Sequence, residues 1–90
     1  MTIDRIAIVG GGTMGNGIAH VAAQSGKQVR LLDLSVEVLE VAMDTISKNL
    51  DRQVKKGLID LSARDATLGR IETGSDLAAG AEDADLVIEA

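Results

Sequence analysis

Three glycines, Gly10, Gly12 and Gly15, form a GxGxxG pattern directly after the apolar run at residues 6–9. A short apolar run that ends at a glycine is typical of a strand buried in a parallel sheet. Between such a strand and a following helix, the three glycines permit a tight turn, close approach of the backbone to a diphosphate, and close packing of the helix. The free N–H groups and the positive dipole at the start of the helix attract the phosphates. The pattern therefore predicts a dinucleotide site.

Asp33 lies eighteen positions after Gly15, close to the offset at which an acid accepts hydrogen bonds from an adenosine ribose. The same carboxylate would repel a 2'-phosphate. Leu34 and Ser35, which follow it, offer no guanidinium to neutralise such a phosphate. We therefore expect the cofactor to be NAD rather than NADP.

The same glycines suggest three other interpretations. A P-loop requires a lysine followed by serine or threonine, whereas Gly15 is followed by Asn16 and Gly17, so this interpretation fails. A purely structural turn is disfavoured, because strand, motif, helix, strand and acid all occur in order. A flavin site shares the glycine pattern, and Ala19 suits it. The glycine loop by itself therefore leaves a flavoprotein open.

The first helix should span residues 13–25, with Gly26 at its C-terminal cap, and a second strand should span residues 28–34. Apolar residues at helical spacing predict which side of this helix is buried: Met14, Ile18, Val21 and Ala22. Ser35 can cap a long second helix that ends by Gly57. Its predicted buried stripe comprises Leu39, Ala42, Met43, Ile46, Leu50 and Val54.

The rest of the chain continues the alternation of helices and strands. Asp60 can cap a short helix through Leu68, and Ser75 a single helical turn through Ala79. Further strands are expected at residues 71–73 and 86–89. Alternating strands and helices predict the α/β class, with a Rossmann-type parallel sheet of about four strands in the order 3-2-1-4. We expect residues 1–90 to be the N-terminal portion of such a domain, and the open edge of strand four, at residues 86–88, to pair with a second copy.

Composition excludes several classes of protein. The 90 residues carry a net charge of -5, which disfavours binding to nucleic acid and to anionic membrane surfaces. Cysteine is absent, so disulfides and thiolate metal sites are excluded, and a cytoplasmic protein is expected. No apolar run approaches the roughly 18 residues of a membrane span. Aromatic residues are also absent, so the core must be aliphatic.

Five segments together resemble the 3-hydroxyacyl-CoA dehydrogenase family: residues 8–19, Asp33, and residues 54–57, 64–71 and 85–90. The resemblance covers almost the whole chain. It implies an enzyme that transfers a hydride between NAD and a 3-hydroxyacyl-CoA. It also implies the cofactor-binding residues Gly10, Gly12, Thr13, Met14, Gly15, Asp33 and the backbone of Ala90, with Lys56 close to the CoA phosphates.

The family's catalytic histidine and glutamate lie, by this resemblance, after residue 90, as does a helical domain that carries dimerisation and much of the substrate pocket. His20, the only histidine of the chain, belongs to a different motif and is assigned no catalytic role. The chain alone should then be inactive. The alternative is a module without catalysis, which binds nucleotides or assembles with itself.

Overall fold

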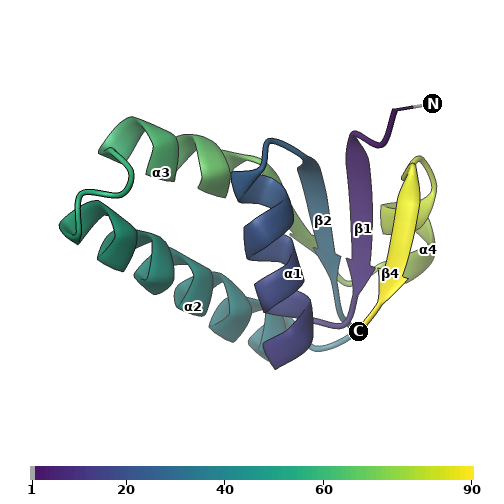
Figure 1. Cartoon of the computed structure of the whole chain (residues 1–90). Coiled ribbons are helices and arrows are strands. Elements are labelled where there is room, and N and C mark those ends of the chain that lie inside the picture. The colour runs from purple at the N-terminus through teal and green to yellow at the C-terminus, as the bar shows by residue number, and fades with distance from the viewer. Residues whose placement is uncertain (1) are drawn as a thin grey trace.

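Four strands form one parallel sheet in the order β3-β2-β1-β4, with β1 and β2 at its centre (Figure 1). The computed structural model describes residues 2–90. The strands are β1 (Arg5–Val9), β2 (Gln28–Leu32), β3 (Ile71–Gly74) and β4 (Leu86–Glu89). The helices are α1 (Thr13–Gln24), α2 (Val36–Lys55), α3 (Leu61–Gly69) and α4 (Leu77–Ala81).

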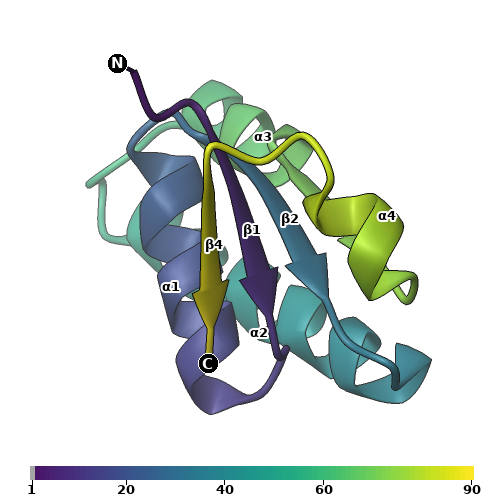
Figure 2. The ribbon, with the colours of Figure 1, turned by 90° about the vertical axis from the view of Figure 1, so that its right-hand side faces the viewer.

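The helices are divided between the two faces of the sheet. Figure 2 shows α1, α2 and α3 on one face and the short α4 on the other. This arrangement follows from right-handed crossovers, because the chain moves one way from β1 to β3 and the other way from β3 to β4. The predicted α/β class, the four parallel strands and the order 3-2-1-4 are therefore confirmed.

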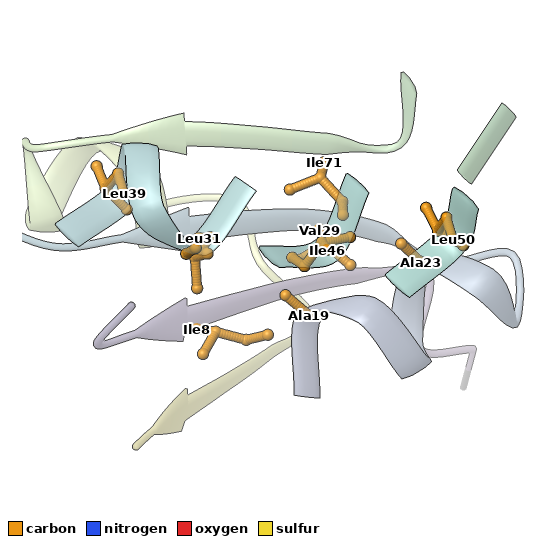
Figure 3. Packing of buried hydrophobic residues seen from close by; sticks show 10 residues of the cluster. Ile8, Ala19, Ala23, Val29, Leu31, Leu39, Ile46, Leu50 and Ile71 are labelled. Atoms are coloured by element: carbon orange, nitrogen blue, oxygen red, sulfur yellow. The ribbon is translucent and has the colours of Figure 1, made fainter. Parts of the chain in front are cut away.

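The core lies between the sheet and the helices α1 and α2, and it is aliphatic throughout (Figure 3). From the sheet come the buried side chains of Ile8, Val29, Leu31 and Ile71. From α2 come Leu39, Ala42, Ile46 and Leu50, each one turn from the next, as the apolar stripe predicted. Burying a side chain such as leucine or isoleucine contributes about 1.5–3 kcal/mol, so these contacts are the main source of stability.

The buried side of α1 differs from the prediction. Met14 and Val21 are 67% and 69% exposed, and the residues that face the sheet are instead Gly15, Ala19 and Ala23. The physical reason is distance: α1 crosses the sheet so closely that only residues with no side chain or a methyl group fit between them. The prediction selected the larger apolar residues, and for Met14 and Val21 it was wrong.

The structure confirms the predicted ends of the helices in part. The hydroxyl of Ser35 accepts a hydrogen bond from the N–H of Val38 at 3.2 Å, which confirms the predicted cap of α2. Gly26 and Gly57 both have positive φ, as a chain reversal after a helix requires. The cap predicted at Ser75 is wrong, because Asp76 holds that position and accepts from the N–H of Ala79 at 3.0 Å.

Polar side chains tie the amino ends of the strands together. The carboxylate of Asp85 accepts hydrogen bonds from the N–H groups of Asp4 and Arg5, both at 2.9 Å, and so anchors β4 beside β1. These two bonds lower the pKa of Asp85. On the face that carries α4, Arg30 pairs with Asp83 and Glu72. Within residues 2–90, no helix has both the length and the apolar character needed to cross a membrane.

Candidate functional site

The glycine loop lies at the carboxyl ends of the strands, where the strand order reverses between β1 and β4. In open α/β sheets this is the place where ligands bind. The N–H of Gly10 donates to the carbonyl of Leu32 at 2.7 Å, and the N–H of Ala90 donates to the carbonyl of Val9 at 2.9 Å. The loop, the end of β2 and the end of β4 therefore meet at one point, and Figure 2 shows the C-terminus beside the amino end of α1.

At positions 10 and 15 the fold requires glycine, because a side chain at either position would meet backbone atoms. Gly10 has a φ of 110°, and a Cβ at this position would lie 2.6 Å from the carbonyl oxygen of Ala90. A Cβ at Gly15 would overlap the carbonyl oxygen of Gly10. The tight turn predicted at Gly10 and the close packing predicted at Gly15 are thus both present.

Gly12 differs from its neighbours because the space around it is open. A Cβ at this position would meet no atom of residues 2–90 within 4 Å. The lack of a side chain is therefore not explained by packing within the described part of the chain. Open space at the mouth of the loop is what the predicted approach of a diphosphate to the backbone needs.

The amino end of α1 is left without a side-chain cap. Its N-cap is Gly12, no side chain in the described chain caps it, and its first turn holds no acid. The other three helices are each capped by a side chain, from Ser35, Asp60 and Asp76. Thr13 and Met14 are exposed in the first turn of α1. Their N–H groups and the positive end of the helix are thus available to an anion.

Asp33 lies one residue beyond β2 and faces the loop. Its Oδ2 accepts from the N–H of Gly11 at 3.0 Å, and its Oδ1 accepts from the N–H of Ser35 at 2.9 Å. The bond from Gly11, and after it the bond from Ser35, lowers the pKa of this carboxyl. Asp33 is therefore ionised at neutral pH and held at both oxygens.

Gly11 is the residue of this site that the sequence-based prediction missed. It occupies a position that the GxGxxG pattern leaves free, and yet it is buried and donates to Asp33. One signal was available: Gly10, Gly11 and Gly12 are consecutive, and a third glycine at a free position needs a reason of its own.

Two other residues lie away from this site. Lys56 caps the far end of α2, a helix of 20 residues, which places it about 30 Å from the end of that helix nearest Asp33. His20 is half-buried between α1 and α2, where its Nε2 is 2.8 Å from Oε1 of Gln24. The structure therefore brings the predicted cofactor residues together at the loop, and it places Lys56, the predicted CoA contact, away from them.

A groove at the other end of the sheet is lined by paired charged residues. It encloses about 290 Å³ at the amino ends of the strands, and its lining includes Arg5, Arg30, Glu72 and Asp83. These four residues pair with one another, and Arg70, which also lines the groove, donates to the carbonyl of Ala23. Within residues 2–90 no three acidic or histidine side chains are grouped closely enough to hold a metal ion.

The residues at the loop fit the dinucleotide predicted from the sequence. An uncapped helix end suits a diphosphate, and the open space at Gly12 admits it. The ionised carboxylate of Asp33 suits the hydroxyls of a ribose and opposes a further phosphate. Since a carboxylate has about four lone-pair positions and two are used, acceptors remain for a ligand.

Comparison with known proteins identifies the family. The family profile described as "3-hydroxyacyl-CoA dehydrogenase, NAD binding domain" matches residues 5–90. A 3-hydroxybutyryl-CoA dehydrogenase from Bradyrhizobium diazoefficiens is 47% identical over 97% of this chain, which corresponds to 29% of that relative. A 3-hydroxyadipyl-CoA dehydrogenase from Escherichia coli is 43% identical over the whole chain, which corresponds to 19% of that relative.

Solved structures show the same similarity in three dimensions. The crystal structure of a 3-hydroxybutyryl-CoA dehydrogenase from Escherichia coli is similar, with a TM-score of 0.94 and 42% identity, over 99% of this chain and 19% of that one. The chain thus spans less than a third of the length of the relatives it matches. It belongs to the 3-hydroxyacyl-CoA dehydrogenase family, and the matched region is the NAD binding domain of that family.

Proposed function

We propose that this chain binds the adenosine diphosphate half of NAD at the amino end of α1, with Asp33 accepting hydrogen bonds from the ribose. The single observation that carries this proposal is the bare end of α1 beside an ionised carboxylate. The N–H groups of Thr13, Met14 and Gly15 would donate hydrogen bonds to the phosphate oxygens. Gly12 would let them come close, because it has no side chain in the way.

The nicotinamide half would pass the end of β4. The carbonyl oxygen of Ala90 lies against Gly10, so the backbone at Ala90 forms the wall of the loop on that side. When bound, NAD supplies the carbon that accepts or donates a hydride. The residues of this chain would bind and orient it.

The test is calorimetric titration of the chain with NAD, ADP and NADP. We expect NAD and ADP to bind with similar affinity, because both carry the diphosphate and the unphosphorylated ribose that the site contacts. NADP should bind at least about tenfold more weakly, because its 2'-phosphate meets the charge of Asp33. Equal binding of NADP and NAD would contradict the role given to Asp33, and failure of all three to bind would overturn the proposal.

For the whole protein, we propose hydride transfer between NAD and a 3-hydroxyacyl-CoA. Residues 1–90 would form the N-terminal portion of its NAD-binding domain. The catalytic base would come from outside this chain, since the only histidine, His20, packs between α1 and α2. Lys56, exposed at the end of α2, would face the CoA phosphates, where an ammonium is well suited to pair with them.

We also propose that the chain associates with a second copy through β4. Within residues 2–90, β4 pairs with β1 alone, and Leu86 and Val87 are 39% and 48% exposed. An open apolar strand leaves backbone donors and acceptors free to pair with another strand. Light scattering at increasing concentration should show a dimer, and Val87→Lys should shift it to monomer. A particle that stays monomeric up to high concentration would exclude this association.

A further inference from the structure

Gly11 connects the glycine loop to the acid at the end of β2. Its N–H donates to Oδ2 of Asp33 at 3.0 Å. Ser35 holds the other oxygen of the same carboxylate at 2.9 Å. Two segments of backbone, one from the loop and one from the start of α2, thus fix the orientation of a single side chain.

The absence of a side chain at Gly11 is a matter of space. Gly11 does not have positive φ, so its backbone conformation does not by itself require glycine. A Cβ at this position would instead lie 3.2 Å from Cγ1 of Val38 and 3.3 Å from Cδ2 of Leu39, both in the first turn of α2. Such contacts are too tight to accept without movement. With alanine, the two side chains or the loop must shift by a few tenths of an ångström, and a shift of the loop would carry the N–H of residue 11 away from Asp33.

We propose that Gly11 is a positioning residue, which directs the free lone pairs of Asp33 toward the ribose and so sets the preference for NAD over NADP. This inference rests on the proposed function, in which Asp33 is the ribose acceptor. A carboxylate already held at both oxygens loses little conformational freedom when a ligand binds. The bond from Gly11 is also the largest cause of the lowered pKa of Asp33, as expected of a donor held against the ionised carboxylate.

The first experiment measures the affinities of NAD and NADP for the parent chain, Gly11→Ala, Asp33→Asn and the double variant. Gly11→Ala should lower the affinity for NAD about tenfold, the value expected when one charge-assisted hydrogen bond is lost. It should lower the affinity for NADP by a smaller factor. In the Asp33→Asn background, Gly11→Ala should leave the ratio of the two affinities unchanged, because the residue through which Gly11 acts is already altered.

A rescue variant and a matched control distinguish a displaced N–H at residue 11 from general damage to the fold. Val38→Ala removes one of the two methyl groups that a Cβ at residue 11 would press against, so Gly11→Ala with Val38→Ala should recover part of the lost preference for NAD. Gly17→Ala is the control, since a Cβ at Gly17 would meet nothing in residues 2–90 within 4 Å. It should leave both affinities unchanged.

A second readout needs no ligand. Carboxyl NMR titration should show a higher pKa for Asp33 in Gly11→Ala than in the parent chain, and a return toward the parent value with Val38→Ala. Gly11→Ala could weaken the binding of NAD and of NADP equally while the pKa of Asp33 stays unchanged. Gly11 then acts on the binding of the phosphates, and the inference is overturned. If the parent chain binds neither dinucleotide, the proposed function fails, and the titration alone then decides whether Gly11 positions Asp33.

Discussion

Replacement of Asp33 by asparagine should lower the affinity for NAD by about 10- to 100-fold and bring the affinities for NAD and NADP close together. The carboxylate is the charged acceptor at the end of β2, and asparagine offers one neutral oxygen in its place. Its amide nitrogen also meets the N–H of either Gly11 or Ser35 as a second donor. The affinity for NAD falls because the hydrogen bonds to the ribose are weaker. The affinity for NADP rises because the repulsion of its 2'-phosphate is removed. Calorimetric titration with both dinucleotides measures the two changes.

The ratio of the two affinities is the decisive quantity in this experiment. A general loosening of the loop would weaken NAD and NADP together and leave their ratio at the parent value. Asp44→Asn is a suitable control, because Asp44 is an exposed acid in α2 that pairs with Lys48 at 2.9 Å. It removes the same charge from the molecule without touching the loop. A parent-like preference for NAD in Asp33→Asn would show that another residue selects the ribose.

Gly15→Ala should have the largest effect on stability of any single methyl group added to this chain. A Cβ at residue 15 would overlap the carbonyl oxygen of Gly10, and both partners of this clash are backbone that no rotamer change can relieve. The helix α1 must then lift from β1, which separates Ala19 and Ala23 from the core. We expect a loss of at least about 3 kcal/mol in the free energy of unfolding, a large share of what a domain of this size possesses.

Urea unfolding followed by far-ultraviolet circular dichroism measures this loss, since the chain has no tryptophan or tyrosine to report it by fluorescence. Gly17→Ala, in the same helix, is the matched control. It replaces an exposed helical glycine with nothing near the new methyl group, and it should stabilise the protein by roughly 0.5–1 kcal/mol. If the two variants unfold at the same urea concentration, the close contact between Gly15 and Gly10 is not what holds α1 in place.

Much of the fold was predictable because its signals are local. The apolar stripe of α2 and the caps at Ser35 and Asp60 each involve residues within a few turns of one another. The order of the strands followed from the alternation of strands and helices together with the handedness of their crossovers. The cap of α4 was misplaced by one residue, because Ser75 and Asp76 are adjacent and are both good capping residues.

The buried side of α1 was not predictable by the same means. Hydrophobic spacing assumes that the larger apolar residues face the core, and here Met14 and Val21 face outward. The error has a cause in the motif itself. Gly15 brings α1 so near to β1 that the neighbouring positions on that side, Ala19 and Ala23, must be small as well. The motif thus contained the information, but only the distance between helix and sheet shows how far its influence extends.

The amino-acid sequence by itself determined the elements, their order, the position of the glycine loop and the acid that follows it. Tertiary structure alone decided that Gly11 holds Asp33, that Ala90 closes against Gly10, and that Lys56 lies at the far end of α2 from the loop. The reason is the range of the interactions. A cap or a stripe depends on residues a few positions apart, whereas contacts between remote segments depend on how closely the helices pack against the sheet.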